Sequence, residues 1–303
     1  MKRLVLILVS SFCISSIYGQ HLEIKDPALL TLIDEESPVI KVSDGYQFTE
    51  GPVWNNEEQY LLFSDIPANT IYKVHPTGEI SPFRQPSKNA NGLTFDSEGD
   101  LIIAEHSGRQ ISRLSPNGDY ASIVNNFNGT AFNSPNDVIV DSQGAIYFTD
   151  PPYGRPKDAT DTLGFNGVYR FFEGETQLIA DDLFRPNGLA LSPDEETLYI
   201  ANSGQPKMFM KYAVSKSGKV GMGEVFYNAS DLDGEGNPDG IKVDQQGNIF
   251  ATGPGGVLVF SPEAKLLGRI IFPETPANLT FGGYGMKTLY VTARTGLYSI
   301  QLK

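Results

Sequence analysis

The residues most suited to binding or catalysis have oxygen-bearing side chains and recur at the starts of predicted β-strands. The positions in question are Glu50, Asn91, Asn136, Asn187, Asp239 and Ala277. All except Ala277 carry a carboxylate or amide oxygen. Such oxygens, gathered at one point, are the ligands that a hard divalent cation requires. The chemistry therefore depends on a fold that brings these positions together.

Each position belongs to a repeated sequence phrase. A polar residue and a small residue are followed by an alternating apolar stretch, an Asp/Gly turn and a second β-rich stretch. The clearest copies begin at Asn91, Asn136, Asn187 and Asp239, and weaker copies begin at Glu50 and near Asn278. The spacing leaves room for four short strands per copy, and no segment shows capped helical periodicity. Radial repetition of such units protects most sheet edges. The sequence therefore predicts an all-β, six-bladed β-propeller with four-stranded blades around a central channel, with five or seven blades as alternatives.

In a propeller the innermost strands run in the same direction along the channel, so their first residues form a ring at one mouth. Two carboxylates and several neutral amides give this ring a formal charge of −2, which suits Ca²⁺ or Mg²⁺. Mn²⁺ is also possible, and Zn²⁺ would be an unusual fit. The alternative is that Asn and Asp simply begin strands after turns. That alternative does not explain why Gly or Asp follows most of these residues.

The second strand of each repeat returns to the same mouth, and the residues just after it are expected to surround the pocket. These residues are Asp65, Glu105, His106, Arg109, Asp150, Tyr153, Asn202 and Arg294. His106 and Arg109 are candidates for contacts to substrate or to an oxyanion, with surface polarity as the alternative. The turn Asp150–Gly154 is rigid because of its two prolines, and it is expected to place the Tyr153 ring near the channel.

The N-terminal residues predict export. Met1-Lys2-Arg3 is a basic start, Leu4 to Val9 is an apolar run, and Gly19 precedes a plausible cleavage site. We therefore expect a signal peptide over residues 1–19 and a single propeller domain over residues 20–303. The mature protein would then be periplasmic or secreted.

Composition excludes several function classes. The formal net charge of −13 argues against nucleic acid and anionic membranes as partners. The only cysteine, Cys13, lies in the predicted signal peptide, which excludes disulfides, thiolate metal sites and a cysteine nucleophile from the mature chain. No serine-hydrolase elbow, P-loop or dinucleotide motif is present, and nothing in the sequence indicates an obligate protein partner.

Several motifs together resemble the gluconolactonase and senescence-marker-protein (regucalcin) family, which includes luciferin-regenerating-enzyme-like proteins. They are Glu50-Gly51-Pro52-Val53-Trp54, Ser134-Pro135-Asn136-Asp137-Val138, Thr149-Asp150-Pro151-Pro152-Tyr153-Gly154, Arg185-Pro186-Asn187-Gly188-Leu189, Asn237-Pro238-Asp239-Gly240 and Asn278-Leu279-Thr280-Phe281-Gly282-Gly283. The resemblance extends from about Val39 to Lys303.

The resemblance implies a six-bladed propeller with one divalent ion bound by a Glu, two Asn and an Asp. Matched by motif, these ligands are Glu50, Asn136, Asn187 and Asp239. Asn91 then becomes a neighbour of the ion on the substrate side.

The resemblance also implies hydrolysis of a sugar lactone. We expect metal-dependent opening of an aldonolactone such as glucono-1,5-lactone, with Asp239 as the base. The substrate side would consist of Asn91, His106, Arg109 and Tyr153. The alternatives are phosphotriester or phosphofluoridate hydrolysis at the same metal and a ligand-binding propeller without enzymatic activity.

Overall fold

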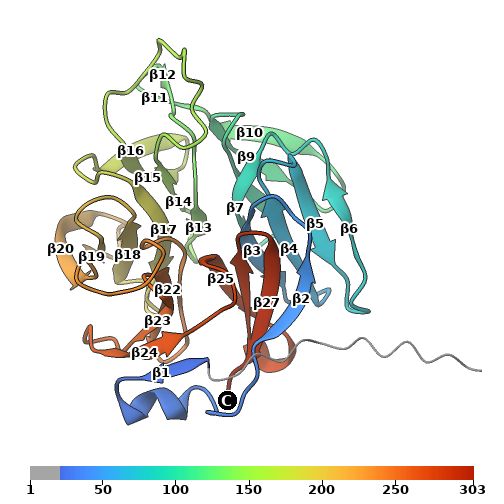
Figure 1. Ribbon diagram of the computed structural model, residues 1–303. Helices are drawn as coiled ribbons and strands as arrows, with labels where there is room; N and C mark the ends of the chain where they lie inside the picture. Colours follow the sequence, from blue (N-terminus) through green and yellow to red (C-terminus); the bar gives the residue numbers. More distant parts are fainter. Residues whose placement is uncertain (1–20) are drawn as a thin grey trace, which may run out of the picture.

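The computed structural model describes residues 21–303, which form antiparallel β-sheets arranged around a central axis (Figure 1). Helical structure in this part of the chain is confined to two short 3-10 segments, η1 (Pro27–Thr31) and η2 (Tyr284–Met286). Neither is long and apolar enough to cross a membrane. The predicted signal peptide lies outside the described residues, so export remains a prediction.

Six sheets form the blades, which confirms the predicted six-bladed propeller. Blade 1 contains β3 (Thr49–Asn55), β4 (Tyr60–Asp65), β5 (Thr70–Val74) and β6 (Ile80–Arg84), and blade 2 contains β7 (Ala90–Phe95), β8 (Leu101–Glu105), β9 (Gln110–Leu114) and β10 (Tyr120–Val124). Blade 3 contains β13 (Val138–Val140), β14 (Ile146–Asp150), β15 (Gly167–Phe172) and β16 (Glu175–Ala180), and blade 4 contains β17 (Pro186–Leu191), β18 (Thr197–Asn202), β19 (Met208–Val214) and β20 (Val220–Asn228). Blade 5 contains β21 (Ile241–Val243), β22 (Ile249–Gly253), β23 (Gly256–Phe260) and β24 (Leu266–Ile270), and blade 6 contains β25 (Pro276–Gly282), β26 (Thr288–Ala293), β27 (Gly296–Gln301) and β2 (Ile40–Asp44).

The ring of blades is closed by the N-terminal part of the chain. Strand β2 pairs antiparallel with β27, so that Ile40 lies opposite Ser299 and supplies the outer strand of the last blade. Strand β1 (Leu22–Ile24) adds a fifth strand to blade 5 beside β24. A small hairpin, β11 (Asn126–Phe127) and β12 (Thr130–Ala131), projects between blades 2 and 3 at the top of Figure 1.

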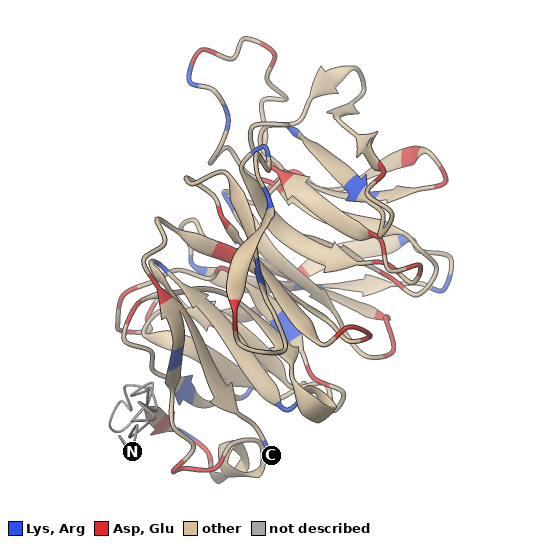
Figure 2. Cartoon of the chain, turned by 90° about the vertical axis from the view of Figure 1, so that its right-hand side faces the viewer, with Lys and Arg blue, Asp and Glu red and all other residues tan. Residues whose placement is uncertain are grey.

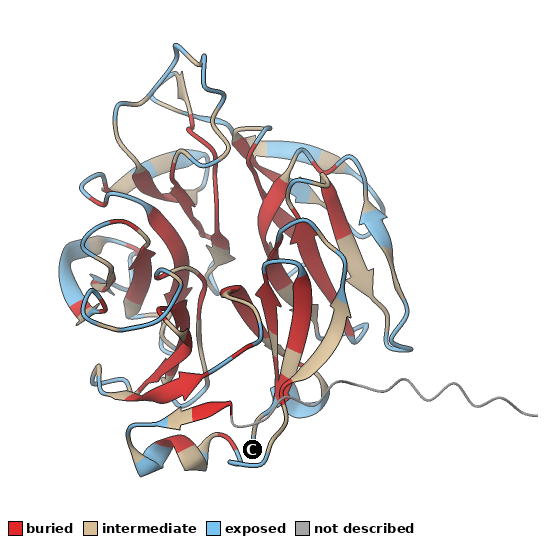
Figure 3. Cartoon of the chain, in the orientation of Figure 1, coloured by how far each residue is buried: buried red, intermediate tan, exposed pale blue. Residues whose placement is uncertain are grey.

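The hydrophobic core lies between the blades. The inner strands are buried, whereas the turns and many outer-strand residues are exposed (Figure 3). Ile102 of blade 2 shares a buried cluster with Phe148 of blade 3. Phe209 of blade 4 packs edge-on against Phe260 of blade 5, with ring centroids 5.6 Å apart. Asp and Glu residues occur mainly on turns and loops (Figure 2), where the charge remains hydrated.

Irregular strand pairing occurs at the predicted ring positions. The pairing of β3 with β4 shifts register between Glu50 and Val53, and that of β17 with β18 shifts between Pro186 and Leu189. Similar shifts occur at the starts of β7 and β25. A bulge changes the direction of the side chains around it. In these four blades the ring residue thereby leaves the regular alternation, whereas Asn136 and Asp239 lie just before the first residues of β13 and β21.

Glycine after the ring residue permits adjacent blades to approach closely. The Gly188 N–H donates to the Asp239 carbonyl at 3.0 Å, and the Gly92 N–H donates to the Asn136 carbonyl at 2.8 Å. A Cβ atom on Gly188 would lie 2.2 Å from the Asp239 oxygen, which no side chain tolerates without a backbone shift. The glycine of the repeated phrase is therefore required by packing of the blades.

Substituting Gly188→Ala is expected to destabilise the fold by roughly 1–3 kcal/mol, because the added methyl group overlaps the neighbouring blade. The matched control is Gly221→Ala on the outer strand β20, where the nearest atom to a new Cβ is 3.5 Å away. Thermal unfolding followed by circular dichroism measures both. Equal melting temperatures for the two variants would contradict the packing argument.

Candidate functional site

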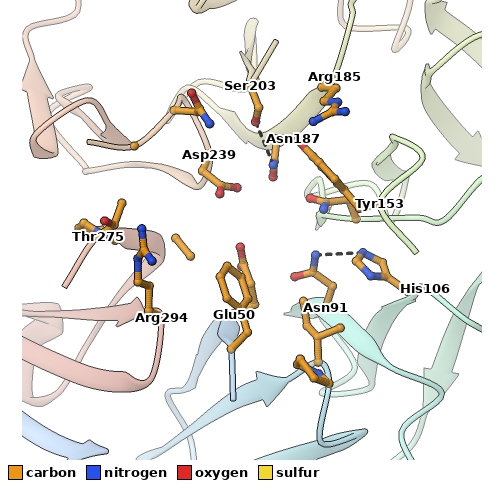
Figure 4. A pocket seen from close by; sticks show the side chains of 18 residues that line it. Glu50, Asn91, His106, Tyr153, Arg185, Asn187, Ser203, Asp239, Thr275 and Arg294 are labelled. Atoms are coloured by element: carbon orange, nitrogen blue, oxygen red, sulfur yellow. Dashed lines mark hydrogen bonds between the residues drawn. The ribbon is translucent and has the colours of Figure 1, made fainter. Parts of the chain in front are cut away.

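The predicted ring residues converge on a cavity of about 610 Å³ at one mouth of the channel. The predicted site residues in its wall are Glu50, Asn91, His106, Asn136, Tyr153, Asn187 and Asp239. Ala277 of blade 6 also lines it and offers no polar side chain. In Figure 4 the Glu50, Asn91, Asn187 and Asp239 side chains point toward a common centre. The structure thus brings together the residues that the repeat places at equivalent positions.

The amide of Asn187 has a fixed orientation. Its Nδ2 donates to Ser203 Oγ at 3.1 Å, and that hydroxyl donates to the Pro238 carbonyl at 2.5 Å. The amide nitrogen is therefore held at the wall. The buried Oδ1 is left without a hydrogen-bond partner among the described residues.

Asn91 is held in the same way by a histidine. Its Nδ2 donates to Nε2 of His106 at 3.1 Å, which requires that ring nitrogen to be unprotonated. Burial lowers the pKa of His106 to about 4, so the imidazole is neutral at physiological pH. The Oδ1 atom of Asn91 is then a second buried oxygen that has no hydrogen-bond partner in the described part of the chain. His106 therefore orients the Asn91 amide, a role that the sequence did not predict.

Two buried carboxylates complete the inner end of the cavity. Glu50 is 3% exposed, and its Oε2 accepts a hydrogen bond from the Gly51 N–H at 2.8 Å. Burial, together with the charge of Asp137, raises the pKa of Glu50 to about 7. Burial and the charge of Glu50 raise the pKa of Asp239 well above its usual range, and Asp239 Oδ1 has no hydrogen-bond partner among residues 21–303.

These observations fit a divalent cation. Buried oxygens without donors are costly, and two desolvated carboxylates repel each other unless a positive charge lies between them. No group of three or more His, Cys, Asp and Glu residues in the described chain could hold a metal. The donors at this site are instead two carboxylates and neutral amides, which is a ligand set for a hard cation. Glu50, Asn187 and Asp239 have the strongest case, and Asn136 lies in the same wall.

Arg109 lies outside this cavity, and the expectation that it contacts substrate needs correction. Its Nη1 binds both carboxylate oxygens of Asp161 at 2.9 and 3.0 Å, and its Nε donates to the Phe132 carbonyl at 2.5 Å. The guanidinium therefore links the loop around Asp161 to the segment that precedes blade 3. Arg109 is a structural residue of that loop.

Most polar residues after the second strands also have structural contacts instead of surrounding the pocket. Asp65 accepts from the Phe48 N–H at 3.1 Å, Asp150 from the Ser134 N–H at 2.7 Å, and Asn202 from the Arg185 N–H at 2.9 Å. Each therefore fixes the loop that leads into the inner strand of its own blade. Glu105 is bound by the hydroxyls of Ser112 and Tyr120. Arg294, in contrast, does line the cavity, as expected.

Sequence reasoning missed a second set of cavity residues. They lie two positions before the ring residues of four blades and are Phe48, Arg185, Asn237 and Thr275. Side chains two residues apart on an extended chain share a face, so the repeat itself contained the signal. These residues form an outer layer above the ring.

The channel below the cavity is crossed by a further polar pair. Asp137 and Asn278 follow the ring positions of blades 3 and 6, and Asn278 Nδ2 donates to Asp137 Oδ2 at 3.4 Å. Both side chains are 2% exposed. They occupy the positions that are glycine in the other blades, and they close the inner end of the site.

Comparison with known proteins places this site in a family. The family model described as the SMP-30/Gluconolactonase/LRE-like region matches residues 48–295. The chain belongs to this family. A gluconolactonase from Zymomonas mobilis is 36% identical, and the alignment covers 91% of this chain and 85% of that protein. A solved gluconolactonase structure from Xanthomonas campestris superposes with a TM-score of 0.85 at 31% identity, covering 93% of this chain and 95% of that one.

A calcium-binding regucalcin from Agrobacterium tumefaciens shares the fold, with a TM-score of 0.74, 19% identity and coverage of 87% of this chain and 94% of that one. The predicted family is thus confirmed. Membership, together with the gluconolactonase relatives, identifies a lactone-hydrolysing enzyme of the gluconolactonase type that acts on sugar lactones.

Cation binding should depend on pH because protons compete for the same carboxylates. The pKa of Glu50 rises on folding from 4.5 to about 7. Without a cation, the stability that this group provides is present below pH 4.5 and is lost as the pH rises through about 7. Added Ca²⁺ should therefore raise the melting temperature more at pH 8 than at pH 5. Differential scanning calorimetry with calcium or chelator measures this.

The control for this experiment is Glu50→Gln, which removes the titrating group and should remove most of the difference between the two pH values. A calcium-induced rise that is as large at pH 5 as at pH 8 would contradict a site built on these carboxylates.

Proposed function

We propose that this protein is a divalent-cation-dependent hydrolase that opens an aldonolactone such as glucono-1,5-lactone to the sugar acid. The observation that supports it best is a set of buried oxygens around one centre, on Asn91, Asn187 and Asp239, that have no hydrogen-bond partner among residues 21–303. The gluconolactonases to which the chain is similar support the choice of substrate class.

Glu50, Asn136, Asn187 and Asp239 would hold the cation, with Ca²⁺ as the first choice and Mg²⁺, Mn²⁺ or Zn²⁺ as alternatives. When bound, it would supply Lewis-acid polarisation of the lactone carbonyl and compensation for the charge of the developing oxyanion. The Glu50 carboxylate is fixed by burial and by the Gly51 N–H, so little reorganisation of this group would accompany the reaction.

Asp239 is the proposed general base. Its carboxylate lies in the cavity wall, and one oxygen has no partner among the described residues that would compete for a proton. It would take a proton from the water that attacks the lactone carbonyl, and the ring C–O bond would break as the proton reaches the leaving oxygen. Because the charge of Glu50 raises the pKa of Asp239, compensation of that charge would favour the ionised form that a base requires.

The outer wall would orient the sugar. Tyr153 is 43% exposed and lies on the side of the cavity near Asn91 and Asn187, where its ring offers an apolar face to a sugar ring (Figure 4). Asn91 would contribute its Oδ1 as an acceptor for a sugar hydroxyl, with His106 keeping the amide in that orientation. His106 thus helps binding without exchanging protons in the reaction.

Replacing the base gives a direct test. Asp239→Asn is expected to lower kcat for glucono-1,5-lactone by at least about 100-fold, since general-base catalysis contributes on this order. With a chelator present, so that the loss of a cation ligand has no effect, the melting temperature should not fall, because a desolvated carboxylate is replaced by an uncharged group of the same shape. A pH-indicator assay corrected for spontaneous lactone opening measures turnover.

The matched control is Asp182→Asn, which makes the same chemical change at an exposed position and should retain full activity. Substantial lactonase activity in Asp239→Asn would contradict the assignment of the base. A wild-type protein that hydrolyses phosphotriesters but no lactone would contradict the proposed function.

A further inference from the structure

Two arginines in the outer wall carry a positive charge that binding of a neutral sugar lactone would not require. Arg185 and Arg294 both line the cavity and lie on different sides of it (Figure 4). Of the described residues, the acidic ones in the wall are Glu50 and Asp239 at its inner end, whose charge a divalent cation would balance. The outer wall would then remain positive, in a chain whose overall formal charge is −13.

Arg185 is held in place in a way that leaves its hydrogen-bond donors free. Its guanidinium carbon lies 5.3 Å from the centre of the Tyr153 ring and 5.5 Å from that of Phe184. Its backbone N–H donates to Asn202 Oδ1 at 2.9 Å, which fixes the loop. Arg185 is exposed at the cavity, and within residues 21–303 its guanidinium makes no hydrogen bond or ion pair, so its donors are available to a ligand.

Arg294 differs in this respect. Its Nη2 lies 3.4 Å from Glu235 Oε2, and both side chains are more than half exposed. This contact provides a negative partner within the protein. The free guanidinium at the cavity is therefore that of Arg185.

A planar guanidinium presents paired N–H donors that match the geometry of a carboxylate or phosphate. Tyr153, which we propose as the platform for the sugar ring, is the same ring on which Arg185 rests. A lactone lying against Tyr153 would therefore have Arg185 beside it.

We propose that Arg185 binds an anionic substituent of the substrate, so that the enzyme prefers sugar lactones that carry an acid group away from the lactone carbonyl. This inference rests on the proposed lactonase function and narrows its substrate class. The shared chemistry is a terminal oxyanion, which is a carboxylate in a lactone of an aldaric acid and a phosphate in a phosphorylated aldonolactone.

The test compares kcat/KM for three lactones: neutral glucono-1,5-lactone, glucaro-1,4-lactone with its free carboxylate, and 6-phosphoglucono-1,5-lactone. The wild-type enzyme should prefer one of the two acidic lactones, and which one it prefers distinguishes carboxylate from phosphate. Arg185→Gln should lower kcat/KM for that lactone about 10- to 100-fold, mainly through KM, because a charged hydrogen bond is lost. The value for the neutral lactone should change less than about threefold.

Two further variants separate this role from general effects of charge. Arg113→Gln makes the same change on β9, where Arg113 contacts Asp96 and Asp100, and it should not alter the preference. Arg294→Gln should reduce the preference less than Arg185→Gln does.

Several results would overturn the inference. They are a wild-type preference for the neutral lactone, an equal loss for all three lactones in Arg185→Gln, and a preference that disappears in Arg294→Gln but not in Arg185→Gln. Absence of turnover of every lactone by the wild-type enzyme would instead overturn the proposed function, and it would be evident before any variant is compared.

Discussion

The close approach of neighbouring inner strands around the channel is the constraint on which the site depends. Backbone N–H groups of one blade donate to the carbonyls of ring residues in the next, as Gly188 does to Asp239. Hydroxyls from second strands add to this, since Thr149 Oγ1 donates to the Asn187 carbonyl at 2.7 Å. The backbone carbonyls of five ring residues are held from the adjacent blade in this way, which keeps their positions at the channel fixed. They are Asn91, Asn136, Asn187, Asp239 and Ala277.

This rigidity explains why unfavourable groups remain buried together. The charge of Glu50 raises the pKa of Asp239, which shows that the two carboxylates repel each other. Without the surrounding backbone contacts they would move apart or toward water. The amides of Asn91 and Asn187 are likewise held with their oxygens inward by His106 and Ser203. Such local conflict with stability is typical of binding and catalytic sites, where a ligand supplies the missing charge.

Much of this architecture could be predicted from the sequence because each blade of the propeller carries the same sequence pattern. Alternating apolar residues and Asp/Gly turns defined the blades, and the polar residue at the start of each repeat defined the ring. The interpretation of the following glycine was incomplete. At Gly188 a glycine is required because the Asp239 carbonyl of the next blade lies too close for a side chain. The glycine of the repeat therefore serves blade packing, and the polar residue before it lines the site.

The errors have a common physical origin, which is that strand periodicity says nothing about the paths of loops. Arg109 follows a second strand, as His106 does, but its backbone has a φ of +50° and its side chain turns to Asp161. Arg185 was not singled out, because its contact with the Tyr153 ring depends on the path of a loop in another blade. The closing of the ring by β2 is a contact between the two ends of the chain and leaves no local pattern.

The account rests on one cation bound among the ring oxygens, and anomalous scattering tests this most directly. Crystals grown with Mn²⁺ should show their strongest anomalous peak in the channel cavity, within bonding distance of Glu50, Asn187 and Asp239 oxygens. Glu50→Gln/Asp239→Asn crystals should lack it. A wild-type protein whose ring oxygens bind no cation, or whose strongest peak lies at the surface, would contradict the central claim.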